Sequence, residues 1–126
     1  MVEKKTIRPW GTYTVIKMGR GYKVKVIEVF PGKRLSLQSH KFRSEHWTVV
    51  SGIGKITCGK KTFYLKSNQG TYIPINTLHR LENAQKTAKL RIVEVQCGSY
   101  IGEDDIRRYD DDFGRVKKAA KSRKKK

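Results

Sequence analysis

Short runs of alternating or continuous apolar residues, separated by turn residues, constrain the fold more than any other feature of this sequence. The clearest run is 22–30, which ends at Pro31-Gly32. Alternation with a period of two is typical of half-buried strands, and no long amphipathic helical pattern accompanies it. Eight further short runs share this character: 12–16, 35–40, 45–50, 55–58, 62–65, 71–74, 78–83 and 89–97. Nine short strands with turns between them predict an all-β sandwich or barrel.

The length and composition favour one globular domain. A chain of 126 residues with 37% hydrophobic and 10% aromatic residues can bury a sizeable core. No apolar run approaches the roughly 18 residues of a membrane span. Residues 1–5 lack the apolar segment of a signal peptide. We therefore expect a cytoplasmic protein without a membrane segment, in which Cys58 and Cys97 are reduced thiols.

The net charge of +18 is unevenly distributed. Residues 116–126 contain seven lysines and arginines and no acidic residue, which leaves +11 on the rest of the chain. Such a run repels itself, so we expect a disordered low-complexity tail. It either contacts nucleic acid or another polyanion, or serves only as a solubilising appendage. The chain thus divides into a lead-in at 1–7, a domain at 8–115 and the tail at 116–126, and the charge on the domain can steer an anionic substrate toward it.

One ten-residue stretch, 38–47, concentrates side chains that carry chemistry. Gln38 and His40 are two residues apart on a predicted strand and so share a face, and Glu45 can rejoin that face after a turn through 41–44. An amide oxygen, an imidazole and a carboxylate directed at one point suit a divalent metal ion. The alternative is that His40 and Glu45 are ordinary surface residues, as single histidines and glutamates usually are.

Two spaced motifs resemble those of the cupin superfamily. They read Gly32-x5-Gln38-x-His40-x4-Glu45-x6-Gly52 and Gly70-x3-Pro74-x-Asn76-x2-His79-x3-Asn83. The resemblance implies a small double-stranded β-helix barrel, or jelly roll, with a metal ion inside it held by Gln38, His40, Glu45 and His79. Gln38 stands where cupins usually have a histidine. Asn76 stands where they have a glycine, and asparagine also tolerates a positive φ.

The resemblance to one cupin family, type II mannose-6-phosphate isomerase, is closer and covers roughly residues 7–115. The segments that carry it are Arg8-Pro9-Trp10-Gly11, Leu35-Ser36-Leu37-Gln38, Arg43-x-Glu45-His46-Trp47, Thr71-Tyr72-Ile73-Pro74, His79-Arg80-Leu81-Glu82-Asn83, Glu94-Val95-Gln96, Gly98-Ser99-Tyr100 and Ile101-Gly102-Glu103-Asp104-Asp105-Ile106. Lys41-Phe42 replaces two histidines that are common in the family, in a turn outside the ligand spacing. In that family the domain usually follows a mannose-1-phosphate guanylyltransferase domain. These 126 residues contain none, so the resemblance implies the isomerase half alone, acting in GDP-mannose and polysaccharide biosynthesis.

The family resemblance implies a metal-dependent interconversion of mannose 6-phosphate and fructose 6-phosphate through an enediol. The mixed nitrogen and oxygen ligands accept zinc, the ion we expect, and also cobalt, manganese, iron or nickel. By resemblance Arg43 is the catalytic arginine, and its guanidinium can stabilise the enediolate or bind phosphate. Glu94 is a candidate proton-transfer base because Ile92 and Gln96 can point inward with it. A glutamate on the strand surface is the equal alternative.

Four further residues are assigned to the substrate, each with an open alternative. Lys25 and Arg80 are candidates for binding the phosphate, although lysines on an alternating strand usually form a solvated face. Gln96 and Tyr100 are assigned to substrate binding in the pocket, although tyrosines more often belong to the core.

Other classes of function stay open from the sequence alone. A cupin can act on another sugar phosphate or on a nucleotide sugar, since one fold hosts many reactions. It can also be a non-catalytic module that binds a sugar or a polyanion. The strands lack the aromatic and basic surface of an RNA-binding sheet, so we assign any nucleic-acid contact to the tail only. The oligomeric state stays open between a monomer and a homodimer formed through edge strands.

Overall fold

The computed structural model describes residues 4–116, and within them the chain forms strands and turns only. These residues contain eleven strands: β1 (Lys5–Arg8), β2 (Gly11–Gly19), β3 (Tyr22–Val29), β4 (Leu37–Ser39), β5 (Arg43–Ser51), β6 (Gly54–Cys58), β7 (Lys61–Leu65), β8 (Gly70–Ile73), β9 (His79–Glu82), β10 (Leu90–Gly98) and β11 (Arg107–Asp110). The all-β prediction is confirmed. No helix in the described part of the chain is long and apolar enough to cross a membrane. The prediction of a disordered tail falls outside the described residues, apart from Val116.

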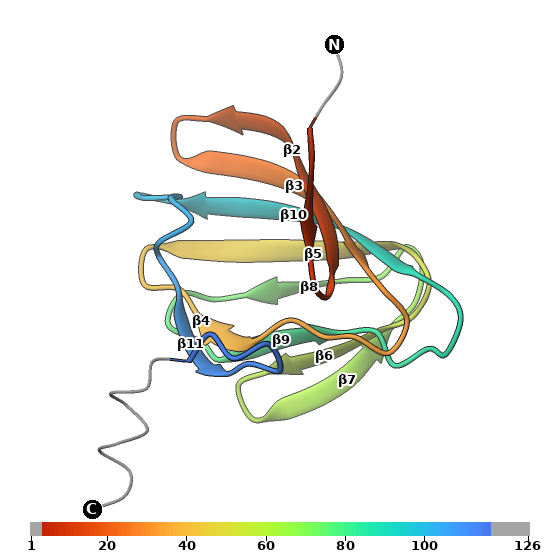
Figure 1. Ribbon diagram of the computed structural model, residues 1–126. Coiled ribbons are helices and arrows are strands. Elements are labelled where there is room, and N and C mark those ends of the chain that lie inside the picture. The colour runs from red at the N-terminus through yellow and green to blue at the C-terminus, as the bar shows by residue number, and fades with distance from the viewer. Residues whose placement is uncertain (1–3, 117–126) are drawn as a thin grey trace, which may run out of the picture.

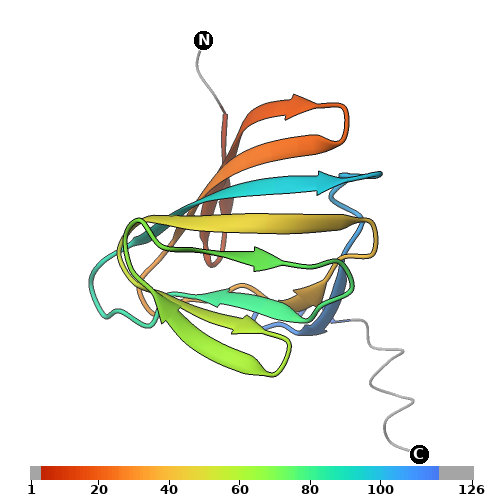
Figure 2. The same ribbon diagram turned by 180° about the vertical axis from the view of Figure 1, so that it is seen from behind.

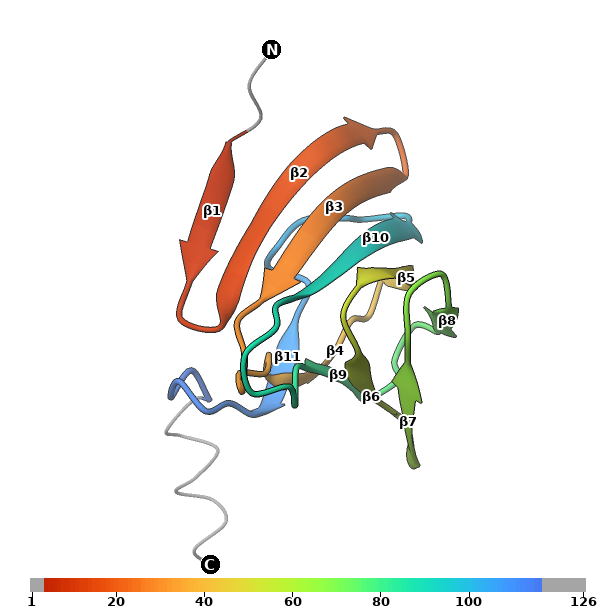
Figure 3. The same ribbon diagram turned by 90° about the vertical axis from the view of Figure 1, so that its right-hand side faces the viewer.

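The strands form two antiparallel sheets (Figure 1). Sheet A has the order β1-β2-β3-β10-β5-β8, and sheet B has the order β11-β4-β9-β6-β7. From behind, β10 and β5 run across the middle of the molecule (Figure 2). Figure 3 shows the two sheets as facing layers. Because β3, β10 and β5 are neighbours although far apart in sequence, the chain crosses repeatedly between the sheets, which is the arrangement of a jelly roll.

Two of the eleven strands were not among the nine expected from the sequence. The segment predicted as a lead-in contributes β1, which pairs with β2 through a turn at Pro9-Trp10. β11 follows a turn at 103–104 and pairs with β4. Both strands are four residues long and mostly exposed, so they lack the alternation that reveals the other strands.

The interior is apolar at one end and polar at the other. Along β5, Arg43, Glu45, Trp47 and Val49 are all buried on the inward face, so the strand passes from charged to apolar side chains. The apolar end is the core, formed by Trp10, Ile27, Val29, Trp47, Val49, Ile56, Leu65, Ile73, Leu81, Leu90 and Ile92. The buried charged side chains of β5 therefore lie at the opposite end of the strand from this core, and that end contains the candidate site.

A turn and two thiols agree with the sequence expectations. Asn76 has a φ of 56°, which confirms that it takes the left-handed conformation of the glycine it replaces. Its backbone N–H donates to the His40 carbonyl at 2.8 Å, so this turn supports a predicted metal ligand.

Cys58 and Cys97 are free cysteines, as expected.

Candidate active site

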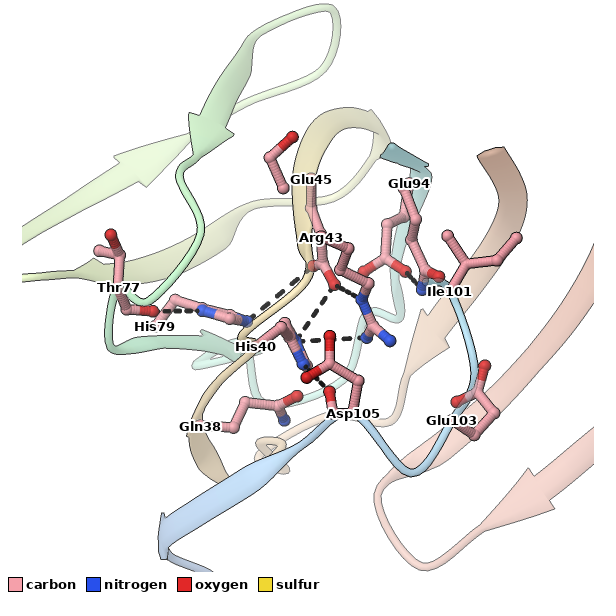
Figure 4. Close-up of polar contacts among 12 residues, drawn as sticks. Gln38, His40, Arg43, Glu45, Thr77, His79, Glu94, Ile101, Glu103 and Asp105 are labelled. Atoms are coloured by element: carbon pink, nitrogen blue, oxygen red, sulfur yellow. Dashed lines mark hydrogen bonds and ion pairs between the residues drawn. The ribbon is translucent and has the colours of Figure 1, made fainter. Parts of the chain in front are cut away.

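Three side chains of the kinds that can ligate a metal ion, called the metal-ligating cluster below, meet between the two sheets. Glu45 comes from β5 of sheet A, whereas His79 opens β9 and His40 follows β4 in sheet B. His40 Nε2 lies 3.2 Å from Glu45 Oε2, and His79 Nε2 lies 3.9 Å from Glu45 Oε1. The three ligand atoms lie within 4.8 Å of one another, and each residue is at most 3% exposed. Figure 4 shows the cluster.

Backbone carbonyls orient both imidazoles. His40 Nδ1 donates to the Asp105 carbonyl at 2.7 Å, and His79 Nδ1 donates to the Thr77 carbonyl at 2.9 Å. Because a carbonyl only accepts, each Nδ1 carries a proton, and Nε2 is the ring atom that each histidine turns toward Glu45. Burial also lowers the pKa of His79, which favours the neutral ring. Two oriented imidazoles and one carboxylate fit a divalent metal ion.

Gln38, the remaining predicted ligand, lies beside this cluster. It faces His79 across the β4–β9 pair and lines the same cavity. Its Nε2 donates to Ser36 Oγ at 2.9 Å, so the amide oxygen is the atom left for a ligand. That oxygen is turned toward His40 (Figure 4). Gln38 stays a predicted ligand.

The Arg43 guanidinium lies against the ligand atoms. Nε donates to Glu45 Oε2 at 2.9 Å, and Nη2 donates to His40 Nε2 at 3.2 Å. Although burial opposes ionisation of Glu45, the two imidazoles and the Arg43 guanidinium hold its pKa well below the usual range. Glu45 is therefore an ionised carboxylate inside the protein.

Glu94 is buried next to this carboxylate, on the inward face of β10 between Ile92 and Gln96. Gln96 Nε2 donates to Glu94 Oε1 at 2.7 Å, and Trp47 Nε1 donates to both Glu94 Oε2 at 3.1 Å and Glu45 Oε1 at 2.9 Å. Burial, followed by the negative charge of Glu45, raises the pKa of Glu94 to about 8. Glu94 thus lies inside the barrel, which is one of the two placements that the sequence left equally open. A carboxyl group of this pKa can exchange a proton near neutral pH.

A cavity of about 360 Å³ opens onto these groups. Its volume lies within the range typical of small-molecule sites, roughly 300–1,000 Å³. The residues that line it are Arg8, Trp10, Tyr13, Lys25, Ile27, Leu35, Gln38, Arg43, Glu45, Trp47, His79, Leu81, Glu94, Glu103, Ile106, Arg108 and Arg115. Charged groups and apolar walls thus enclose one space, which suits a small polar ligand.

The segment after β10 closes one side of the site. The Glu103 carboxylate forms ion pairs with Lys23 Nζ and Lys25 Nζ, each at 2.8 Å. The Asp105 carboxylate accepts the backbone N–H groups of Lys41 and Phe42, at 2.8 and 2.9 Å. Lys23, Glu103 and Asp105 were missed as site residues from the sequence. The only signal for the two acids was their place in the segment Gly102-Glu103-Asp104-Asp105-Ile106.

Three predicted substrate residues lie outside the lining of this cavity. Arg80 is buried, but its guanidinium donates to the Leu35 and Asp110 carbonyls and pairs with the Asp110 carboxylate at 3.0 Å. Tyr100 is 47% exposed and donates to Asp104 at 2.5 Å. Gln96 is buried behind Glu94, and its Oε1 has no hydrogen-bond partner. Lys25 lines the cavity, but it holds Glu103 there.

Comparisons with known proteins match both the sequence and the fold. A family model described as the mannose-6-phosphate isomerase C-terminal matches residues 1–111. The alginate biosynthesis protein AlgA of Pseudomonas aeruginosa is 56% identical over 113 residues, covering 90% of this chain and 23% of AlgA. The xanthan biosynthesis protein XanB of Xanthomonas campestris pv. campestris is 52% identical over 113 residues, covering 90% of this chain and 24% of XanB. The chain spans about a quarter of the length of these relatives.

A solved structure supports the architecture. A Klebsiella pneumoniae protein with a double-stranded β-helix domain superposes with a TM-score of 0.70 at 18% identity, and the match covers 82% of this chain and 88% of that one. At this identity the likeness shows the fold alone. The double-stranded β-helix expected from the cupin motifs is confirmed.

Proposed function

The chain belongs to the mannose-6-phosphate isomerase C-terminal family, and we propose that it interconverts mannose 6-phosphate and fructose 6-phosphate with the help of a divalent metal ion. The observation that carries the proposal is the convergence of three metal-ligating side chains, an arginine and a carboxyl group of raised pKa at one cavity. The reaction moves a proton between C1 and C2 of the open-chain sugar. It therefore needs an acid–base group and a means of stabilising negative charge on oxygen.

The residues that would hold the ion are His40, Glu45 and His79, with the amide oxygen of Gln38. When bound, the ion supplies a Lewis acid that polarises the sugar carbonyl and stabilises negative charge on its oxygen. The fit is supported by the burial of the donor set and by the two Nδ1 hydrogen bonds that fix the imidazoles.

Glu94 is the residue proposed to move the proton. Its pKa of about 8 lets the carboxylate take a proton from one sugar carbon and return it to the neighbouring carbon near neutral pH. Gln96 and Trp47 each donate to one of its oxygens, so the carboxyl group is held in one orientation. Such support keeps a catalytic group aligned with the substrate.

Arg43 is the residue proposed to stabilise the enediolate. An arginine guanidinium is a planar, delocalised cation, and the contacts of Arg43 to Glu45 and His40 hold it beside the reacting end of the cavity. The apolar side chains of Trp10, Leu35 and Leu81 line the same space. They exclude water there and so strengthen the electrostatic contribution of the guanidinium.

Turnover by the full-length protein tests this assignment. Protein shown to contain metal is incubated with mannose 6-phosphate, and fructose 6-phosphate is measured; we expect it to form. A parallel panel of other aldose phosphates and nucleotide sugars defines the substrate. If metal-replete protein forms no fructose 6-phosphate, the proposed function is wrong. Turnover of another sugar alone would show that this sugar, and not mannose 6-phosphate, is the substrate.

The wider role follows from the relatives. AlgA and XanB are named for alginate and xanthan biosynthesis. By extension, we propose that the present chain supplies sugar phosphate for polysaccharide precursors. The cytoplasmic location, the homodimer and the contact of the basic tail with a polyanion stay predictions from the sequence.

A further inference from the structure

Three arginines from the two ends of the domain line one wall of the cavity: Arg8 on β1, Arg108 on β11 and Arg115 beyond it. Asp111 neutralises Arg115 through contacts to Nε at 2.7 Å and Nη2 at 3.3 Å. Within residues 4–116, no carboxylate lies within 4.0 Å of the guanidinium of Arg8 or Arg108. This wall, called the arginine wall below, therefore presents to the cavity two guanidinium groups that have no carboxylate as an ion-pair partner.

Arg108 carries an unsatisfied donor. Its Nε is buried and has no hydrogen-bond partner among the described residues. Burial, followed by the positive charge of Arg115, lowers its pKa; the negative charge of Asp111 opposes this shift, and the positive charge of Arg8 adds to it. A buried donor without an acceptor destabilises a folded protein unless a ligand supplies one. An anion with several oxygens would satisfy the donor and relieve the repulsion.

The arginine wall stands at a defined distance from the metal-ligating cluster. Arg108 faces Gln38 across the β11–β4 pair, and Gln38 faces His79 across the β4–β9 pair. Residues opposite one another in antiparallel strands share a face, so these three form one row that points into the cavity. Neighbouring strands are about 4.8 Å apart, which places Arg108 roughly 10 Å from His79. An open-chain six-carbon sugar with its carbonyl at one end and its phosphate at the other spans such a row.

Other cations near the cavity are already paired with carboxylates. Lys23 and Lys25 both hold Glu103, and Arg80 holds Asp110 outside the cavity lining. We propose that Arg8 and Arg108 form the site that binds the phosphate monoester of the substrate, with Arg115 adding positive charge. The identity of the sugar rests on the proposed function, whereas the binding of phosphate to this wall does not.

Inorganic phosphate is the probe that tests the site. The full-length protein, freed of metal by dialysis against a chelator, is titrated calorimetrically with inorganic phosphate at near-physiological salt. We expect saturable binding that Arg108→Gln weakens roughly 10- to 100-fold, since hydrogen bonds to charged groups are among the strong ones. Arg8→Gln, at an exposed position where folding is not at risk, should weaken it by a smaller factor.

Arg107→Gln is the matched control. Arg107 precedes Arg108 on the same strand, is exposed, and lies against the ring of Tyr109 with Cζ 5.0 Å from the ring centroid. The substitution makes the same change in charge on the opposite face of β11 and should leave binding unchanged. His79→Ala should also leave it unchanged, because the phosphate does not occupy the metal-ligating cluster.

Three results would overturn the site. They are the absence of saturable binding by the wild type, an equal loss in Arg107→Gln, and a loss in His79→Ala. If the protein turns over no sugar phosphate but shows the expected binding pattern, the proposed function fails and the phosphate site stands. If it does turn over substrate, Arg108→Gln should raise KM at least tenfold, with a smaller effect on kcat.

Discussion

Asp105 links the metal-ligating cluster to the segment that closes the site, so its replacement by asparagine tests how the site is held. The carboxylate is 8% exposed and accepts the N–H groups of Lys41 and Phe42, at 2.8 and 2.9 Å. The carbonyl of the same residue accepts from His40 Nδ1. An asparagine has one oxygen where the aspartate has two, so its amide N–H₂ must face one of the two backbone donors.

The magnitude follows from these contacts. Asp105→Asn removes one charge-assisted hydrogen bond and leaves a backbone donor unsatisfied, which should lower the free energy of unfolding by about 1.5–3 kcal/mol. For a domain of this size, that corresponds to a fall in Tm of roughly 5–12 °C. Because the turn that carries His40 loosens, metal affinity should also fall, by roughly 10- to 100-fold.

The assay is thermal denaturation of the metal-free protein, together with metal titration. Asp104→Asn is the matched control, because this exposed neighbour undergoes the same change in charge and, among the described side chains, forms a hydrogen bond only with the Tyr100 hydroxyl. We expect the control to change stability by no more than about 0.5 kcal/mol. If the two variants unfold and bind metal alike, the structural role assigned to Asp105 is refuted.

Two further predictions concern acidic residues. Glu94→Gln should lower kcat at least roughly 100-fold without loss of metal, whereas Glu82→Gln, outside the cavity lining, should leave kcat unchanged. Steady-state kinetics together with metal analysis checks both variants. A Glu94→Gln variant with normal kcat would exclude Glu94 as the base. Burial opposes the ionisation of Glu103, but Lys25 and Lys23 lower its pKa from 4.5 to about 2. Its ion pairs therefore stabilise the fold above pH 4.5, and this contribution is lost as the pH falls toward 2. The difference in urea midpoint between wild type and Glu103→Gln should be largest at neutral pH and close toward pH 2, and a constant difference would contradict the reasoning.

The alternating pattern predicted most strands but not which face of each strand is buried. In β3, Lys23 and Lys25 are buried, whereas Val24 and Val26 are only partly buried on the other face. The lysines face inward because Glu103, far along the chain, supplies a carboxylate for both. Alternation shows which residues share a face, and a partner distant in sequence decides which face is interior.

The candidate metal ligands were more predictable than the candidate substrate residues. Spacing and family motifs indicated His40, Glu45 and His79, and the structure brings them together. Arg80 was proposed for the phosphate but pairs with Asp110. That contact depends on β11, a short exposed strand that no periodicity reveals. Arg108 was missed for the same reason, because its place on the cavity wall depends on the pairing of β11 with β4.

Metal content measured together with isomerase activity tests the central claim most directly. Three proteins are compared: wild type, His79→Ala, and His46→Ala as the control. His46 follows Glu45 on β5 but is exposed, and it packs against Tyr72 with ring centroids 4.7 Å apart. We predict that wild type and His46→Ala bind a divalent metal ion and convert mannose 6-phosphate, and that His79→Ala loses both properties. Full metal content and full turnover in His79→Ala would contradict the account.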